Sequence, residues 1–268
     1  MSKYKIGIIG SGSLGSIIAN VISKDLAENY EVIGILSGRI ENATKLANKI
    51  NCKAYSYIGE MIDDKPDYII EAASPKVVKD LAVKILENGI NFIVLSVGAF
   101  ADNVFYKKVE EVAKKNNSRV HLASGAVGGF DVLSSAMLMD NVSVEITTQK
   151  SPNSSNGAPF LQGRELSQDN AEDVFTGTAK EAIKVFPKNI NVAVATGLAT
   201  VGVDYTKVNI RSVPGMKSNK HSIKLEGDSI KVSVEIESIP SADNPKSSSL
   251  AAWSVIALLK RLVSPITF

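Results

Sequence analysis

Near the start of the chain runs Lys5-Ile6-Gly7-Ile8-Ile9-Gly10-Ser11-Gly12-Ser13-Leu14-Gly15, the stretch that decides the fold. It predicts a short buried strand, a glycine turn and the first turn of a helix, with Gly10, Gly12 and Gly15 in the pattern G-x-G-x-x-G. In dinucleotide-binding proteins the first glycine makes a tight turn, the second lets the backbone approach a pyrophosphate, and the third lets the helix pack on the strand. If a parallel sheet surrounds the turn, we expect cofactor contacts from Gly10, Ser11, Gly12, Ser13, Leu14 and Gly15.

The first half of the chain supplies that context. Apolar runs predict six strands, at residues 4–9, 31–36, 54–57, 67–73, 92–97 and 119–123. Helical periodicity predicts intervening helices at residues 14–22, 40–50, 75–88 and 102–116. Strands separated by helices of ten or more residues predict a right-handed, doubly wound parallel sheet, so the glycine turn belongs to a Rossmann domain.

Three of these strands end in small residues, at Ser74, at Ser96-Val97-Gly98 and at Ser124-Gly125-Ala126. Ligands of open α/β sheets bind outside the carboxyl ends of the strands. We therefore expect Ser74, Ser96 and Gly98 to contact the cofactor and Ser124 to contact the substrate. The alternative is that all of them only form turns, as serine and glycine often do.

The end of the second predicted strand bears on the choice of cofactor. An acidic residue about 20 positions beyond the glycines binds the 2′-hydroxyl of NAD, whereas a nearby arginine accommodates the 2′-phosphate of NADP. Here the turn is Ser37-Gly38-Arg39, with no carboxylate before Glu41. We expect NADP or NAD as cofactor, with NADP bound at least as well; the alternative is that Arg39 is only a solvated charge.

The composition excludes several classes of protein. The 268 residues are 44% hydrophobic and 22% charged, which is typical of a globular protein. A net charge of +2 gives no electrostatic reason to expect nucleic acid or an anionic membrane as partner. The single cysteine, Cys52, suits a reducing compartment, and no signal peptide or apolar run of membrane-spanning length is evident. We expect a cytoplasmic protein.

The second half predicts an α+β domain. Helices are expected at residues 131–139, 178–186, 190–200 and 247–262, and strands at 142–149, 207–213, 222–226 and 229–238. The polar stretch 152–173 is expected to be a lid or a poorly ordered excursion. We assign residues 1–130 to the dinucleotide-binding domain, 131–243 to a substrate-binding and dimerisation domain, and 244–268 to a helix that packs back across the domains.

The chain has two histidines. His121 falls inside a predicted strand, where a structural role is expected. His221 falls in a polar stretch between predicted strands, and its ordinary pKa near 6.5 suits proton transfer. The alternative is a surface residue. Neither a Ser/His/Asp arrangement nor metal-ligand spacing of histidines and cysteines is visible, so no metal is expected.

Several longer runs resemble one family. They are Leu95-Ser96-Val97-Gly98-Ala99-Phe100-Ala101-Asp102, Ala123-Ser124-Gly125-Ala126-Val127-Gly128-Gly129-Phe130-Asp131, Phe186-Pro187-Lys188-Asn189-Ile190-Asn191-Val192-Ala193, Asn219-Lys220-His221 and Asn244-Pro245-Lys246-Ser247-Ser248. Over nearly its whole length the chain resembles the L-aspartate dehydrogenase family. The resemblance implies a Rossmann domain, a second α/β domain that carries a homodimer interface, and NAD(P)-dependent deamination of L-aspartate through iminoaspartate to oxaloacetate and ammonia. In many bacteria and archaea this imine feeds NAD biosynthesis.

The resemblance also implies roles for residues. His221 matches the catalytic histidine, and Ala126 with either Asn189 or Asn191 matches contacts near the nicotinamide. Two features depart from the family pattern, namely the Ser37-Gly38-Arg39 turn and a long 152–173 segment.

A dicarboxylate substrate needs cationic partners. Candidate substrate residues are Lys150, Arg164, Asn219 and Lys246, although each cation could equally be an exposed charge. Two other functions stay open: a homoserine or sugar dehydrogenase with a similar Rossmann half, and a non-catalytic NADP sensor.

Overall fold

A computed structural model describes residues 2–155, 158–186, 190–239 and 248–267. The chain forms two compact units. The first unit comprises Met1–Ala123 and Ala251–Phe268, and the second comprises Ser124–Leu250.

The first unit is a six-stranded parallel sheet with strand order β3-β2-β1-β4-β5-β6. The strands are β1 (Tyr4–Ile9), β2 (Tyr30–Leu36), β3 (Lys53–Tyr55), β4 (Tyr68–Glu71), β5 (Asn91–Val94) and β6 (Val120–Leu122). The helices are α1 (Ser13–Asp25), α2 (Ile40–Ile50), α3 (Ile58–Asp63), α4 (Pro75–Glu87) and α5 (Asn103–Lys115). The strand order reverses between β1 and β4, and a crevice at such a switch point is where ligands of this architecture bind. The predicted doubly wound sheet is confirmed.

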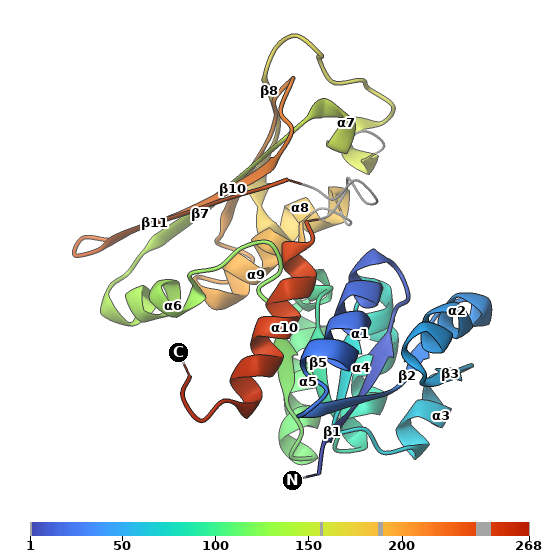
Figure 1. Ribbon diagram of the computed structural model, residues 1–268. Coiled ribbons are helices and arrows are strands. Elements are labelled where there is room, and N and C mark those ends of the chain that lie inside the picture. The colour runs from blue at the N-terminus through green and yellow to red at the C-terminus, as the bar shows by residue number, and fades with distance from the viewer. Residues whose placement is uncertain (1, 156–157, 187–189, 240–247, 268) are drawn as a thin grey trace. The chain divides into compact units, whose positions relative to one another are not determined.

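The last helix, α10 (Leu250–Val263), belongs to the core of this unit. Its residues Val255, Ile256 and Leu259 share an apolar cluster with Ile8 on β1, and all of them are buried. In addition, the hydroxyl of Tyr30 donates a hydrogen bond of 2.8 Å to the carbonyl of Leu259. Figure 1 shows α10 beside α1.

The second unit contains a mixed five-stranded sheet with order β11-β10-β7-β9-β8. Its strands are β7 (Ser143–Lys150), β8 (Glu172–Thr178), β9 (Lys207–Ser212), β10 (Asn219–Glu226) and β11 (Lys231–Ser238). Its helices are α6 (Phe130–Met139), α7 (Pro152–Ser155), α8 (Ala179–Val185) and α9 (Asn191–Ala199). In Figure 1, α6, α8 and α9 lie on the same face of the sheet. The opposite face carries ion pairs, among them Lys207–Glu145 and Lys220–Glu235.

In the second unit, the largest differences from the sequence prediction concern two strands. β8 was not expected, because a register shift between Asp173 and Phe175 breaks the alternation by which a strand is recognised. β10 begins at Asn219 rather than at residue 222, because the polar residues at its start are paired with β7 and β11. The expectation that His221 lies in a loop is therefore wrong, since it lies within a strand.

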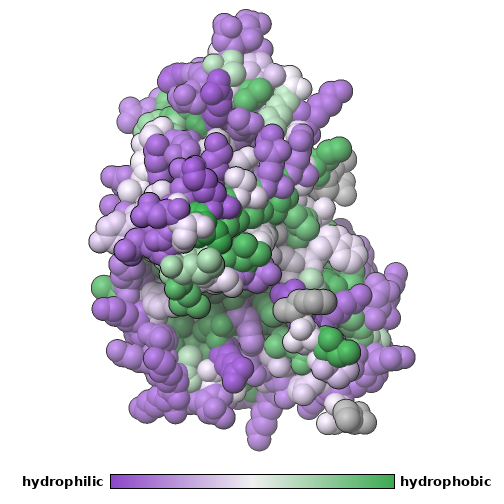
Figure 2. Space-filling model, turned by 90° about the vertical axis from the view of Figure 1, so that its left-hand side faces the viewer, coloured by the Kyte–Doolittle hydropathy of each residue, from purple (hydrophilic) through white to green (hydrophobic). Residues whose placement is uncertain are grey.

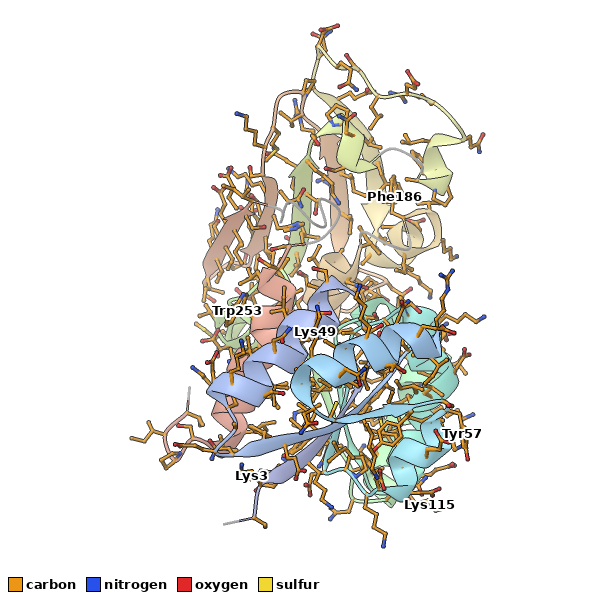
Figure 3. All side chains as sticks on the ribbon, turned by 45° about the vertical axis from the view of Figure 1, so that its right-hand side comes forward. Lys3, Lys49, Tyr57, Lys115, Phe186 and Trp253 are labelled. Carbon is orange, nitrogen blue, oxygen red and sulfur yellow. The ribbon has the colours of Figure 1, made fainter. Side chains whose placement is uncertain are left out.

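The described part of the 152–173 segment is anchored rather than structureless. It contains α7 and a 3-10 helix, Pro159–Leu161, and leads into β8. The ring of Phe160 packs on those of Phe175 and Phe186, at centroid distances of 5.7 and 5.5 Å. Figure 3 labels Phe186, which follows α8. The described residues of this segment thus contain two short helical elements where the sequence analysis expected none, and its action as a lid stays a prediction.

Apolar side chains of both units lie mainly in their cores. On the face of the molecule drawn in Figure 2, hydrophilic residues lie mainly around the edge and hydrophobic residues gather near the middle. Among the described residues, we find no helix whose length and apolar character would let it span a bilayer.

Candidate active site

The glycine turn after β1 leaves open space at one glycine only. A Cβ on Gly10 would collide with the carbonyl oxygen of Ala72, and a Cβ on Gly15 with that of Gly10. Gly10 also has a φ of +116°, a conformation that L-residues rarely adopt. A Cβ on Gly12, in contrast, would meet no protein atom within 4 Å. The fold itself requires Gly10 and Gly15, whereas the bare backbone of Gly12 borders free space that suits a pyrophosphate.

The amino end of α1 complements an anion. It has no side-chain cap and no acidic residue in its first turn, where Ser13, Leu14 and Gly15 lie. Unpaired amides at a helix start attract negative charge. The hydroxyl of Ser11 donates to that of Ser37 at 2.8 Å, and so joins the glycine turn to the end of β2.

The turn after β2 leaves room for a further anionic group. A Cβ on Gly38 would meet no atom within 4 Å. Arg39 is exposed and, among the described residues, has no ion-pair partner. It precedes α2, which has no side-chain cap either. These residues fit an adenosine ribose with or without a 2′-phosphate, so the chain's first unit fits NAD(P).

The turns that follow β4 and β5 both contact the buried side chain of Glu71, which the sequence analysis missed. Glu71 is fully buried and accepts hydrogen bonds from the backbone N–H and the hydroxyl of Ser96. Ser74 caps α4 by accepting from the amide of Val77 at 3.4 Å, and Gly98 is buried in the 3-10 helix Val97–Ala101. A single acid in an otherwise apolar strand was the signal that could have revealed Glu71.

In the second unit, polar residues gather at one end of the buried face of the sheet. Ile223 pairs with Ile146 in an apolar row. His221 and Thr148 form the next row on this face. Beyond it, Lys150 is opposite Ser212, and Asn219 is opposite Ser238. Side chains two residues apart on a strand share a face, so these groups lie together.

His221 is held as a neutral imidazole. It is only 6% exposed, and its Nδ1 lies 3.0 Å from the hydroxyl oxygen of Thr148. Burial, and secondarily the charge of Lys150, lowers the pKa of His221 to about 4. At neutral pH the ring is therefore a proton acceptor through one nitrogen. Which nitrogen carries the proton follows from the direction of the Thr148 hydrogen bond.

Lys150 is a buried cation without an acidic partner among the described residues. Its side chain is 6% exposed, and burial lowers its pKa from 10.5 to about 8. Across the strand pair, the hydroxyl of Ser212 is fully buried and has no described hydrogen-bond partner. An unpaired buried charge and an unpaired buried hydroxyl are both costly. Both would be satisfied by an anionic ligand. Thr148 and Ser212 escaped the sequence analysis because only the strand register brings them to His221 and Lys150.

The remaining predicted site residues are placed as follows. Arg164 forms an ion pair with Glu172 at the start of β8, so its guanidinium already has an anion. Ser124 and Ala126 lie in the turn after β6, and Asn191 is the first residue of α9. Asn189 and Lys246 lie outside the described residues. Within the described ranges, no three His, Cys, Asp or Glu side chains form a group that could hold a metal ion.

Known proteins match both units. The family described as "Aspartate dehydrogenase, C-terminal" matches residues 131–262, and "Homoserine dehydrogenase, NAD binding domain" matches residues 10–123. The chain is 37% identical to L-aspartate dehydrogenase of Methanosarcina barkeri over 267 residues, which cover 98% of each chain. It is 32% identical to L-aspartate dehydrogenase of Methanocella arvoryzae over 266 residues, again with 98% of each covered.

Solved structures agree with these matches. The crystal structure of aspartate dehydrogenase from Thermotoga maritima matches with a TM-score of 0.76 and 29% identity over 100% of both chains. A hyperthermophilic archaeal homoserine dehydrogenase matches with a TM-score of 0.59 and 14% identity over 97% of both chains, which shows a shared fold only. On these similarities, the chain belongs to the L-aspartate dehydrogenase family.

Proposed function

We propose that this protein is an NAD(P)-dependent dehydrogenase that converts L-aspartate, through iminoaspartate, to oxaloacetate and ammonia, in a reversible reaction. One observation carries the proposal: the neutral imidazole of His221 lies at the end of a sheet face where Lys150 is buried without a described counter-ion. An acidic amino acid supplies the carboxylate that this cation lacks.

The first unit holds the cofactor, which when bound accepts the hydride from the α-carbon of the substrate. The turn from Gly10 to Gly15 and the start of α1 bind the pyrophosphate, while Ser37 and Arg39 face the adenosine ribose. Ser74, Ser96 and Gly98 line the part of the site that takes the nicotinamide half of the cofactor. With Arg39 unpaired and no acid before Glu41, NADP binds at least as well as NAD.

In the second unit, Lys150 and Ser212 bind one carboxylate of L-aspartate, and Asn219 donates a further hydrogen bond. A carboxylate beside Lys150 offsets the positive charge that repels a proton on His221, so substrate binding raises the pKa of the imidazole. His221 then acts as base, taking a proton either from the substrate ammonium, which permits loss of the hydride, or from the water that attacks the imine carbon. We assign no substrate contact to Arg164, because Glu172 neutralises it.

The family resemblance further supports a homodimer formed through the second unit, a cytoplasmic location and a role in supplying iminoaspartate for NAD biosynthesis. Light scattering coupled to size-exclusion chromatography tests the dimer. A mass of 28.6 kDa, that of one chain, would contradict it.

The activity is tested by the absorbance of NADPH and of NADH with oxaloacetate and ammonia, and then with L-aspartate and the oxidised cofactors. We expect turnover with these substrates and little with homoserine, which lacks the second carboxylate. Turnover with homoserine alone would identify a homoserine dehydrogenase instead. Binding of NADPH without turnover of any substrate would identify a sensor.

A further inference from the structure

Glu71 is a buried acid that has no role in the proposed reaction. It is the last residue of β4, and its side chain is 0% exposed. β4 lies next to β1, where the strand order reverses. The following residue, Ala72, approaches the glycine turn so closely that its carbonyl oxygen occupies the place of a Cβ on Gly10. Glu71 therefore lies beside the switch-point crevice.

The hydrogen bonds of Glu71 stabilise the ionised form of its side chain. One side-chain oxygen accepts from the amide of Ala73 at 2.7 Å and from the hydroxyl of Ser96 at 2.8 Å. The other accepts from the amide of Ser96 at 3.0 Å. Backbone amides can only donate, and an ionised carboxyl group can only accept. The arrangement joins the turn after β4 to the turn after β5 through one side chain.

No described cation compensates the negative charge of the ionised form. Burial raises the pKa of Glu71 above its ordinary value, and the hydrogen bonds from the backbone of Ser96, Ala73 and Ser74 and from the Ser96 hydroxyl offset this only in part. No lysine or arginine forms an ion pair with it among the described residues. Burying a carboxylate without a cation costs free energy that the hydrogen bonds only partly offset. A positively charged ligand beside it would lower that cost.

The two halves of such a sheet each bind one half of a dinucleotide. The adenosine half belongs to β1–β3, where Ser37 and Arg39 lie, so the nicotinamide half belongs to β4–β6. We propose that Glu71 is a positioning residue whose carboxylate makes the site prefer the oxidised cofactor. The oxidised nicotinamide ring is cationic and the reduced ring is neutral, so a nearby carboxylate stabilises only the first. This inference rests on the cofactor binding proposed above.

The test compares dissociation constants for oxidised and reduced cofactor, measured by calorimetry and by the fluorescence of the bound reduced form. Glu71→Gln keeps the size of the side chain and removes the charge. We expect the ratio Kd(reduced)/Kd(oxidised) to fall by about tenfold, the effect of one charge at roughly 10 Å in a medium of intermediate dielectric. Glu71→Asp keeps the charge but disturbs the turns, so both constants rise while the ratio stays nearer to that of the wild type. Glu87→Gln, at the exposed end of α4, is the matched control and changes neither.

An unchanged ratio in folded Glu71→Gln would overturn the inference, while the proposed cofactor binding would stand. If the wild type bound neither form, the proposed function itself would fail. The wild-type protein gives a second test that needs no variant to fold. We expect it to bind the reduced cofactor no more tightly than the oxidised one, and tenfold tighter binding of the reduced form would contradict a negative charge near the ring.

Discussion

The two units differ in the kind of polar group that they present to a ligand. In the first unit the glycine turn offers backbone amides, and what matters at Gly12 is the absence of a side chain. In the second unit the offered groups are buried side chains, Lys150, His221 and Ser212, held on three different strands. In the proposed function the backbone site binds only the cofactor, so it is compatible with many kinds of substrate. The site of buried side chains is matched to one charge and would therefore determine which substrate binds.

The largest effect is expected for His221→Ala in the second unit. Loss of the proton acceptor lowers kcat by about 10²–10⁴-fold, the usual contribution of general acid–base catalysis. Dissociation constants for the cofactor stay within about twofold, because the first unit is untouched. Stopped-flow and steady-state measurements of reduced cofactor check both quantities. Unchanged turnover in His221→Ala would show that His221 is not the catalytic base.

Removing the charge of Lys150 should weaken substrate binding without lowering folding stability. Lys150→Met lowers kcat/KM for L-aspartate by about 10²-fold, the value of a charge-assisted hydrogen bond. The free energy of unfolding does not fall, because the wild type carries the penalty of an unpaired buried charge. In the wild type, kcat/KM falls as the pH rises through about 8, where Lys150 loses its proton. Over the same range, stability rises, since the unfolded chain binds that proton more tightly than the folded one.

Denaturant titration and initial rates check these expectations. Lys224→Met is the matched control, an exposed lysine on β10 whose side chain does not share the buried face. A loss of stability in Lys150→Met with intact kcat/KM would show that Lys150 is structural and does not bind substrate.

Substitution by alanine at two glycines of the first unit should affect two different properties, folding stability at Gly15 and cofactor binding at Gly12. Gly15→Ala forces its Cβ against the carbonyl of Gly10 and should cost about 1–3 kcal/mol of folding stability. Gly12→Ala changes stability by less than about 1 kcal/mol, because its Cβ meets no protein atom. It weakens cofactor binding by about tenfold, because the methyl group enters the space of the pyrophosphate. Thermal unfolding and cofactor titration measure the pair, and equal losses of stability would refute the distinction.

The smallest effect concerns the choice between cofactors. Arg39→Gln raises the Kd of NADP by about tenfold and leaves that of NAD unchanged, because only NADP offers a phosphate to the guanidinium. Arg261→Gln, at the exposed end of α10, is the control. If Arg39→Gln weakened NAD and NADP equally, the guanidinium would have no role in discriminating them.

The sequence predicted the first unit well because its information is local. The glycine turn, the strands at 4–9 and 31–36 and the helix at 40–50 each follow from consecutive residues, and the structure has them within one residue or exactly where expected. The resemblance to one family, and the function drawn from it, rested on equally local motifs and agrees with the comparisons.

The second unit was less predictable, because its site depends on strand register. Ser212 is 62 positions from Lys150, yet the pairing of β7 with β9 brings them opposite each other. His221 was expected in a loop, because Asn219 and Lys220 are polar, but pairing with β7 places it in a buried row. Register follows from the hydrophobic pattern of whole strands and from turn geometry, which a single short motif does not contain.

The central claim is that a dicarboxylate binds beside Lys150 and His221, and NMR titration of the histidine rings tests it most directly. The chain has only two histidines, so a His121→Gln variant leaves the signal of His221 alone. Without ligand we expect a pKa of about 4. With saturating succinate at constant ionic strength, the pKa should rise by about 1 unit or more, because an anion is added next to the ring. In Lys150→Met the unliganded pKa should already be higher, since the repelling charge is gone, and succinate should have little further effect. A pKa of His221 that stays unmoved by succinate in the wild type would contradict the account.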